Sequence, residues 1–280
     1  MTIVEKLSPK VIIFDDLPPE TNAMALAMYS RDPRSVEIHR KHIARVGADK
    51  FMQTYYVGYG DKSIGDCGTT TVCAENVSML VAKAIQNNRL YNGQEASTRY
   101  LDMSAQPILN PLGTAEGEQI QKTWMSLYSH ALQILVPHLA SKYPILSDED
   151  PKVYGKAIKA KAFDIARSFL PAGATTFVGW HTNLRQAWDH IKELSFHPLE
   201  EVRKIASKML AEILEMYPNS FGFKTYPEQD KFYEDCSKFT YEFLPLCQSF
   251  SFTHTINIKR LRMVVSKLEL LKNRPFKAEL

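Results

Sequence analysis

The sequence contains no long hydrophobic run. Its start reads MTIVEKLSPKVIIFDDLPPE, in which acidic residues and prolines soon interrupt a short apolar patch. This start is unlike the apolar core of a secretory signal. No uninterrupted apolar stretch approaches the roughly 20 residues that a membrane-spanning helix needs. We therefore expect a cytoplasmic protein with no membrane segment.

Cysteine and histidine are sparse, and neither follows a metal-binding pattern. None of the four cysteines forms a CxxC pair, and the eight histidines form no HExxH motif. These absences argue against a zinc site and a redox dithiol, so we expect no metal and reduced thiols. The closest histidines, His39 and His42, are predicted to lie on the surface of a basic helix.

An excess of charge of one sign is also missing. The formal net charge is +3, and the basic residues are scattered along the chain. Neither a nucleic-acid-binding stripe nor a polybasic membrane anchor is indicated, whereas a small anionic ligand remains possible. With 45% hydrophobic and 23% charged residues among 280, the chain is long enough to bury a sizeable core.

Apolar spacing predicts several long helices and few strands. We expect a short strand at residues 10–16, a helix from about Glu20, and a helix over residues 72–88 with a buried stripe. Further helices are predicted around residues 120–137, where Pro137 should end or kink the helix, over residues 157–170, and after Pro198. Alternation at residues 250–256 predicts a strand, followed by a helix. This mixture favours an α+β domain over a regularly alternating sheet.

Polar residues that could hold a ligand are concentrated in residues 87–100, NNRLYNGQEASTRY. Arginine presents a planar fork of donors that can grip a phosphate in two places, and a serine hydroxyl can complete the oxyanion shell. A carboxylate such as Glu95 would orient the arginines or accept from a ligand hydroxyl. Taken alone, the stretch is also compatible with a solvated polar face. The nearby glycine-rich passage VGYGDKSIGDCGTTT allows close backbone approach to a ligand, or forms a simple connecting loop.

The stretch NNRLYNGQEASTRY resembles the pattern RHRxxSxNExSxRY of flavin-dependent thymidylate synthases. The matching residues are Arg89, Glu95, Ser97, Arg99 and Tyr100. Upstream, GDKSIGDC resembles the family's GHxSxxEH segment. Downstream, ARSFLPAGATTFVGWHTNLR is similar to a stretch with an arginine, then Leu-Pro, then Asn-x-Arg. Three partial matches in the correct order are more specific than any one of them.

The resemblance implies two sets of site residues. The residues matching the deoxyuridylate contacts are Glu95, Ser97, Arg99 and Arg167. The residues matching the flavin contacts are Ser63, Asp66, Asn87, Asn88, Arg89, Asn183 and Arg185. Among these, the resemblance assigns the catalytic roles to Arg89 and Arg167.

The sequence departs from the family pattern at several positions. Asn87 and Asn88 stand in place of an arginine and a histidine, and Asp61 and Cys67 replace two further histidines. Leu194 occupies the position of an arginine that the family directs at the bound pyrimidine. Loss of that cation removes electrostatic stabilisation from a pyrimidine whose C5 becomes nucleophilic.

The resemblance also implies a fold and a reaction. The fold has long helices packed on a small, mostly antiparallel sheet; we assign it to residues 1–216, with a C-terminal extension at residues 217–280. The reaction transfers a one-carbon unit from methylenetetrahydrofolate to C5 of dUMP, with FAD as cofactor, NADPH as reductant and a homotetramer as the assembly. Two alternatives remain open: C5 methylation or hydroxymethylation of another pyrimidine nucleotide, and a catalytically silent nucleotide-binding subunit.

Overall fold

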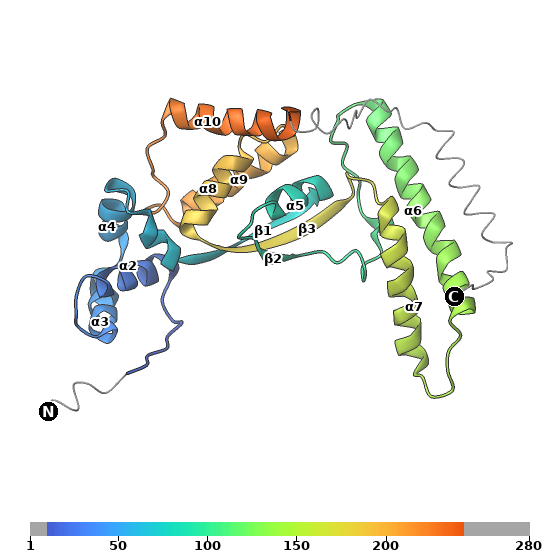
Figure 1. Ribbon diagram of the computed structural model, residues 1–280, viewed down its shortest axis with the longest axis horizontal. Helices are drawn as coiled ribbons and strands as arrows, with labels where there is room; N and C mark the ends of the chain where they lie inside the picture. Colours follow the sequence, from blue (N-terminus) through green and yellow to red (C-terminus); the bar gives the residue numbers. More distant parts are fainter. Residues whose placement is uncertain (1–9, 244–280) are drawn as a thin grey trace. The chain divides into compact units, whose positions relative to one another are not determined.

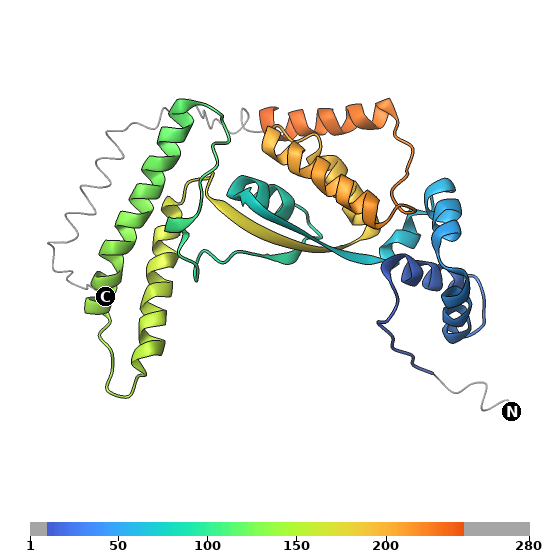
Figure 2. The same ribbon diagram turned by 180° about the vertical axis from the view of Figure 1, so that it is seen from behind.

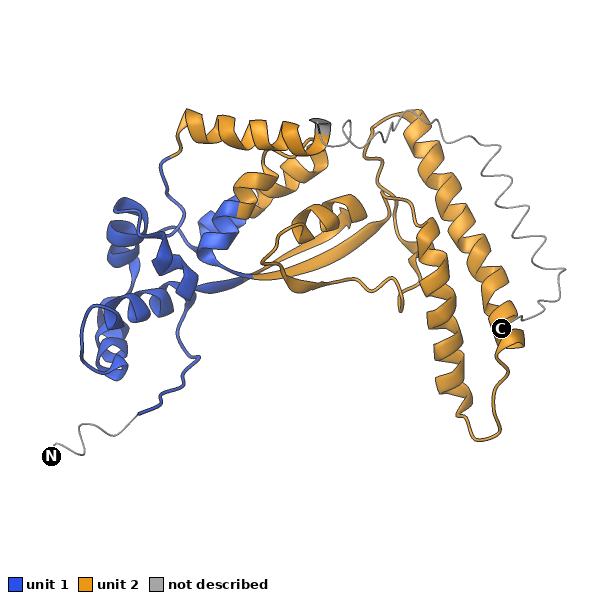
Figure 3. Ribbon diagram, viewed as in Figure 1, with its two compact units in different colours: residues 1–70, 182–189, 210–224 blue, residues 71–181, 190–209, 225–280 orange. Residues whose placement is uncertain are grey.

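A computed structural model describes residues 10–243 of the chain (Figure 1). The chain divides into two compact units (Figure 3). The first contains the residues up to 70 together with 182–189 and 210–224; the second contains 71–181, 190–209 and the residues from 225 onward.

The first unit is built from short helices. They are α2 (Pro19–Tyr29), α3 (Val36–Val46), α4 (Asp49–Phe51), the π-helix η1 (Met52–Gly58) and the 3₁₀ helix η2 (Lys62–Cys67). A proline in the first turn starts α2, and the Ser35 side chain caps α3 by accepting from the Glu37 amide. The helix predicted from about Glu20 is confirmed.

Two predictions for this unit are wrong. Residues 10–16 form no strand, because they pair with no other strand in the described part of the chain, and Val11 and Ile13 are exposed. His39 is buried rather than on the surface, since it lies on the same face of α3 as the buried Val36 and Ile43. His42 is exposed, as expected.

A small sheet runs through the second unit. Its strands are β1 (Thr69–Ser78), β2 (Asn92–Glu95) and β3 (Thr175–Asn183), in the order β1-β3-β2. The ribbon shows β3 between its neighbours (Figure 2). Strand β2 is antiparallel to β3, with Asn92 opposite His181 and Glu95 opposite Val178. The α+β class with long helices and a small antiparallel sheet is therefore confirmed.

The helix predicted over residues 72–88 starts later than expected. The β-branched run at its beginning belongs to β1, and the helix α5 (Met79–Gln86) begins only after Ser78, whose hydroxyl accepts from the Val81 amide at 3.2 Å. Of the predicted stripe, Val81, Ala84 and Ile85 are buried in α5, Leu80 is half-buried, and Val77 is buried but belongs to the strand. Buried apolar residues thus occur both at the end of the strand and in the helix that follows.

The longest helices of the second unit form an antiparallel hairpin. They are α6 (Ala115–Lys142) and α7 (Pro151–Ala166), which lie side by side in both ribbon views. Their apolar core includes Tyr128, Ala131 and Ala162, each fully buried. The prediction left open whether Pro137 ends or kinks this helix. Pro137 does not end α6, because the helix continues to Lys142. Packing against α7 offsets the backbone hydrogen bond that a proline removes.

The remaining helices follow β3. They are α8 (Leu184–Leu194), α9 (Glu200–Met216), α10 (Pro227–Lys238) and the π-helix η5 (Phe239–Phe243). Helix α9 confirms the amphipathic helix predicted after Pro198, with Val202 and Ala206 buried. The strand and helix predicted beyond residue 249 lie outside the described residues. No helix in residues 10–243 combines the length and apolar character needed to cross a membrane.

Two glycines of the second unit provide a matched test of the packing. A Cβ on Gly93 of β2 would collide with the Gly179 carbonyl oxygen of β3, whereas a Cβ on Gly155 of α7 would meet open space. We expect Gly93→Ala to lower the free energy of unfolding by about 1–3 kcal/mol. Gly155→Ala, in a helix interior, should raise it by about 0.5–1 kcal/mol. Urea denaturation of both variants checks the sheet pairing, and equal effects would contradict it.

Candidate functional site

The segment between α5 and β2 carries the first group of predicted residues. Asn87 is the C-terminal cap of α5, and the Asn88 side chain accepts from the Leu90 amide at 2.9 Å. Arg89 follows in this turn and is exposed. Both asparagines thus shape the turn that presents Arg89.

Glu95 is held by helix α5. Its Oε2 lies 2.7 Å from Lys83 Nζ and accepts from Gln86 Nε2 at 2.8 Å. The sequence predicts that Glu95 either orients the arginines or accepts from a ligand hydroxyl. Because the strand register turns Glu95 toward α5, its carboxylate is instead fixed by a lysine and an amide, and only 17% of the side chain is exposed.

Arg99 and Arg167 converge on one carboxylate, that of Asp164. Arg99 Nε lies 3.3 Å and Arg167 Nη2 2.8 Å from Asp164 Oδ1. These are ion-pair distances, and Oδ1 has no aligned hydrogen bond in the described chain. Two guanidinium groups around one carboxylate leave a net positive charge, which suits an anionic ligand.

Ser97 begins the turn that delivers Arg99 to this cluster. Its carbonyl oxygen accepts from the amides of Tyr100 and Leu101, both at 3.0 Å. The side chain is half-buried. The turn therefore brings Arg99 from the end of β2 to the C-terminal end of α7, where Asp164 and Arg167 lie.

The remaining flavin-matching residues lie in the first unit. Arg185 Nη2 pairs with Asp66 Oδ2 at 2.6 Å. Arg185 Nε and Asp66 Oδ1 are buried without a hydrogen-bond partner among the described residues, so the pair keeps a donor and an acceptor for a ligand. The side chain of Asn183 has a structural role, because its Oδ1 accepts a hydrogen bond from the Gln186 amide at 2.9 Å.

Ser63 belongs to a second ion-pair group of the first unit. Its hydroxyl donates to Asp61 Oδ1 at 2.6 Å, and Arg31 Nη2 lies 2.6 Å from Asp61 Oδ2. The hydrogen bond from Ser63, and then Arg31, lower the pKa of the Asp61 carboxyl. Asp61 is thus an anion where the family pattern has a histidine.

Cys67 stands at the other replaced histidine and is not an activated nucleophile. Burial raises the pKa of its thiol, and the neighbouring Asp66 adds to the effect. A nucleophilic cysteine needs the opposite shift, which favours the thiolate. The described residues also contain no cluster of His, Cys, Asp or Glu that could hold a metal ion.

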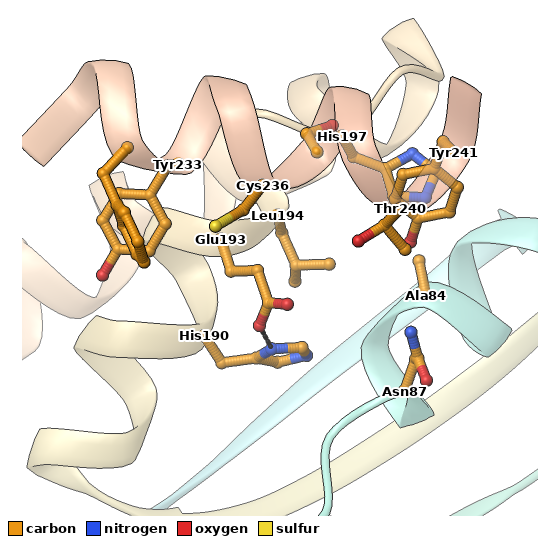
Figure 4. Close-up of a pocket in the computed structure, with 12 residues that line it drawn as sticks. Ala84, Asn87, His190, Glu193, Leu194, His197, Tyr233, Cys236, Thr240 and Tyr241 are labelled. Carbon is orange, nitrogen blue, oxygen red and sulfur yellow. Dashed lines mark hydrogen bonds and ion pairs between the residues drawn. The ribbon is translucent and has the colours of Figure 1, made fainter. Parts of the chain in front are cut away.

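Leu194 and Asn87, two departures from the family pattern, line the same pocket of the second unit (Figure 4). Leu194 is buried at the end of α8 and brings no charge. Tyr241 of η5 lines this pocket as well. A residue of the C-terminal extension therefore shares a pocket with the turn that presents Arg89.

The structure brings some of the predicted residues together and separates others by unit. Arg99 and Arg167 meet directly, and Arg185 meets Asp66. The second unit holds the residues assigned to the nucleotide together with the turn of residues 87–89, and the first unit holds the other flavin-matching residues. Sequence reasoning missed Asp164, although its position three residues before Arg167, within the helix predicted over residues 157–170, was an available signal.

A family model described as thymidylate synthase complementing protein matches residues 14–219. The chain belongs to this family, so the membership predicted from the three motifs is confirmed. The match includes every predicted site residue and ends before α10.

Similar proteins were found by sequence and by structure. A UPF0159 protein of Chlamydia pneumoniae is 28% identical over 187 residues, which cover 61% of this chain and 35% of that protein. A UPF0159 protein of Thermoplasma acidophilum is 27% identical over 231 residues, which cover 69% of this chain and 46% of that protein. The chain thus spans about a third to a half of the length of these curated relatives. A crystal structure of a flavin-dependent thymidylate synthase from Helicobacter pylori, complexed with FAD and dUMP, has a TM-score of 0.44 and 12% identity, covering 74% of this chain and 96% of that one.

His197 is buried and lines the pocket that also contains Asn87 and Leu194. Its titration predicts that the stability of the protein depends on pH. Burial, and then Arg203, lower its pKa from 6.5 in the folded protein. The unfolded chain therefore binds the proton more readily, so stability is complete above about pH 6.5 and falls as the pH drops below it. We expect His197→Phe to flatten this fall in urea denaturation between pH 7 and pH 5.

The exposed His42 provides the control for this experiment. His42→Gln removes a histidine from the surface of α3 and should leave the pH profile of the wild-type protein unchanged. An identical profile for His197→Phe and the wild-type protein would show that the buried ring is not the group responsible.

Proposed function

We propose that this chain transfers a one-carbon unit from methylenetetrahydrofolate to C5 of dUMP, with FAD as cofactor and NADPH as reductant. The observation that carries the proposal is the convergence of Arg99 and Arg167 on Asp164 in a member of the thymidylate synthase complementing protein family. These arginines are 68 positions apart in the sequence, yet they form one cationic cluster. A phosphate monoester is the anion that such a paired fork grips best.

In this proposal the second unit binds the nucleotide. The guanidinium groups of Arg99 and Arg167 hold the phosphate, and the hydroxyl of the adjacent Ser97 donates to it. Glu95 is already oriented by Lys83 and Gln86, so its carboxylate accepts from a ligand hydroxyl without having to be repositioned. Deoxyuridylate is thereby held at both its phosphate and its sugar.

The residues that would hold FAD fit its charge. Arg185 keeps a buried Nε donor without a partner in the described chain, and Arg89 is an exposed cation, so each is suited to a diphosphate. Ser63, Asp66, Asn88 and Asn183 complete the polar set that the resemblance assigns to the cofactor. When bound, the flavin would supply the hydride for the transferred carbon.

The protein's own part in the chemistry is electrostatic. We assign Arg89 and Arg167 the role of stabilising negative charge on the substrate, an effect often worth several kcal/mol. No enzyme nucleophile is required, and the raised pKa of the Cys67 thiol agrees with this. The apolar Leu194 lies where the family pattern places a further cation, so fewer cations are available than in that pattern.

Two observations favour a second candidate, a nucleotide-binding subunit without catalysis. Leu194 brings no charge, and Asn87 and Asn88 are uncharged where the family pattern has an arginine and a histidine. Such a subunit would keep the Arg99–Arg167 cluster and lose flavin. A third candidate, chemistry at C5 of another pyrimidine nucleotide, shares the flavin with the first. The visible spectrum of the purified protein therefore separates the second candidate from the other two.

Removal of one arginine of the cluster tests nucleotide binding. We expect Arg99→Ala to weaken dUMP binding by roughly one to two decades, because one charge-assisted contact is worth about 1.5–3 kcal/mol. Isothermal titration calorimetry with dUMP measures the effect. Deoxyuridine, which has no phosphate, should bind weakly to both the wild-type protein and the variant.

An arginine of the first unit provides the matched control. Arg34→Ala also removes one positive charge, from an exposed side chain paired with Asp32. It should leave dUMP affinity unchanged. Equal affinity of the wild-type protein for dUMP and deoxyuridine would overturn the assignment of the phosphate site.

Flavin binding is tested by titration of FAD into the purified protein. We expect FAD to raise the melting temperature and to be readily lost during purification, because Asn87 and Asn88 bring no charge to its phosphates. Arg185→Ala should weaken the effect, and Arg45→Ala, on the exposed side of α3, should not. Restoring arginine and histidine at positions 87 and 88 should tighten binding, provided that the pocket is still shaped for the isoalloxazine ring. If the purified protein is colourless and FAD does not change its melting temperature, the proposal of flavin chemistry is contradicted. The nucleotide-binding subunit without catalysis is then favoured.

We also propose that the working form is a cytoplasmic homotetramer. The support is the resemblance, in which the matched flavin and nucleotide segments meet across subunits. Light scattering at micromolar concentration with dUMP present should give a mass well above that of one chain. A monomeric mass would contradict the proposal.

A further inference from the structure

The pocket that Asn87 and Leu194 line has two walls of different origin. One wall comes from α5, the end of α8 and His197, all within the segment matched by the family. The other comes from α10 and η5, beyond residue 219, where that match ends. The volume of this partly open pocket is about 170 Å³. Figure 4 shows the side chains of both walls facing this space.

Specific contacts fasten the second wall in place. The rings of Phe196 and Tyr233 stack with their centroids 5.8 Å apart, and Lys192 Nζ lies 3.3 Å from Asp230 Oδ1. The Tyr241 ring meets His197 edge-on at 4.7 Å. Because these contacts lie at both ends of the wall, α10 and η5 form a defined surface over the pocket.

One donor of the pocket has no acceptor among the described residues. His197 is only 9% exposed, and its Nδ1 accepts from the Leu199 amide at 3.1 Å. Since burial lowers its pKa, the ring is neutral at pH 7 and carries its hydrogen on Nε2. No residue in the described chain accepts from that Nε2, so this donor is available to a ligand in the pocket.

The charge of the lining selects against anions. None of the described lining residues is a lysine or an arginine, and the one carboxylate, Glu193, faces His190 Nδ1 at 3.2 Å. A phosphate or carboxylate bound here would have no counter-charge. Phe232 and Tyr241 instead offer aromatic surface. The lining therefore favours an uncharged, flat ligand.

We propose that this pocket binds a small uncharged aromatic ring that accepts a hydrogen bond from His197 Nε2. The size agrees, because a cavity of about 150 Å³ in another protein holds benzene. The site is separate from the Arg99–Arg167 cluster, and it does not rest on the proposed reaction. It also gives Asn87 and Leu194 a common role, as the floor on which the second wall closes.

Cys236 provides a reporter, because it lines the pocket and is exposed, and Cys73 on β1 is an exposed reference within the same unit. The probes are pyrazine, which is uncharged and has acceptor nitrogens, benzene, which has the same shape and no acceptor, and pyrazine-2-carboxylate, which is an anion. The full chain is alkylated with iodoacetamide at each probe concentration. Peptide mass spectrometry follows the two cysteines separately.

We expect pyrazine at millimolar concentration to slow alkylation of Cys236 at least threefold and to leave Cys73 unchanged. Benzene should protect about three- to tenfold less well at equal concentration, since it lacks the hydrogen bond. Pyrazine-2-carboxylate should not protect. The proposal is overturned if pyrazine leaves Cys236 unprotected, if Cys73 slows equally, or if the anion or benzene protects as well as pyrazine does.

The variant His197→Phe isolates the hydrogen bond. It keeps an aromatic ring and removes the donor, so pyrazine and benzene should protect Cys236 equally. A pyrazine preference that survives in the variant would overturn the role of His197. Because the comparison of probes on the wild-type protein stands by itself, the proposal remains testable even if this variant does not fold.

Discussion

The register between β2 and β3 is the constraint on which the nucleotide-binding side of the molecule depends. It places Glu95 opposite Val178 and turns its carboxylate toward Lys83 and Gln86 of α5. A slip by one residue would move every side chain of β2 to the other face of the sheet. The turn that follows β2 would shift with it, and Arg99 would no longer reach α7. The close approach of Gly93 to the Gly179 carbonyl helps to fix this register, since a larger residue does not fit.

The cluster of Arg99, Asp164 and Arg167 shows how a modest interaction organises a site. All three side chains are partly exposed, so each ion pair contributes little to stability. The value of the carboxylate is geometric, because it holds two mutually repelling guanidinium groups at the end of one helix before any ligand arrives. An incoming phosphate meets arginines that are already placed, and less side-chain freedom is lost on binding.

Family membership was predictable from sequence because the motifs keep their order and spacing, which is enough to place Arg89, Arg99 and Arg167. The contacts themselves were less accessible. Asp164 lies outside every motif, and its meeting with Arg99 depends on a turn and a helix end far apart in the chain. The strand β3 was missed because residues 175–183 mix threonine, glycine and aromatic residues without a clear apolar run. His39 was misjudged because a histidine on a charged helix looks solvent-facing until its neighbours Val36 and Ile43 define the buried side.

Asn87 and Tyr241 line the same pocket, so a motif position shares its surroundings with a segment beyond the family match. An arginine at position 87 would bring a longer, charged side chain into a pocket whose described lining contains no lysine or arginine. A change at this position would therefore alter the wall beneath α10 and η5 as well as the motif itself. The added segment makes the cost of changing residue 87 depend on residues that the family match does not include.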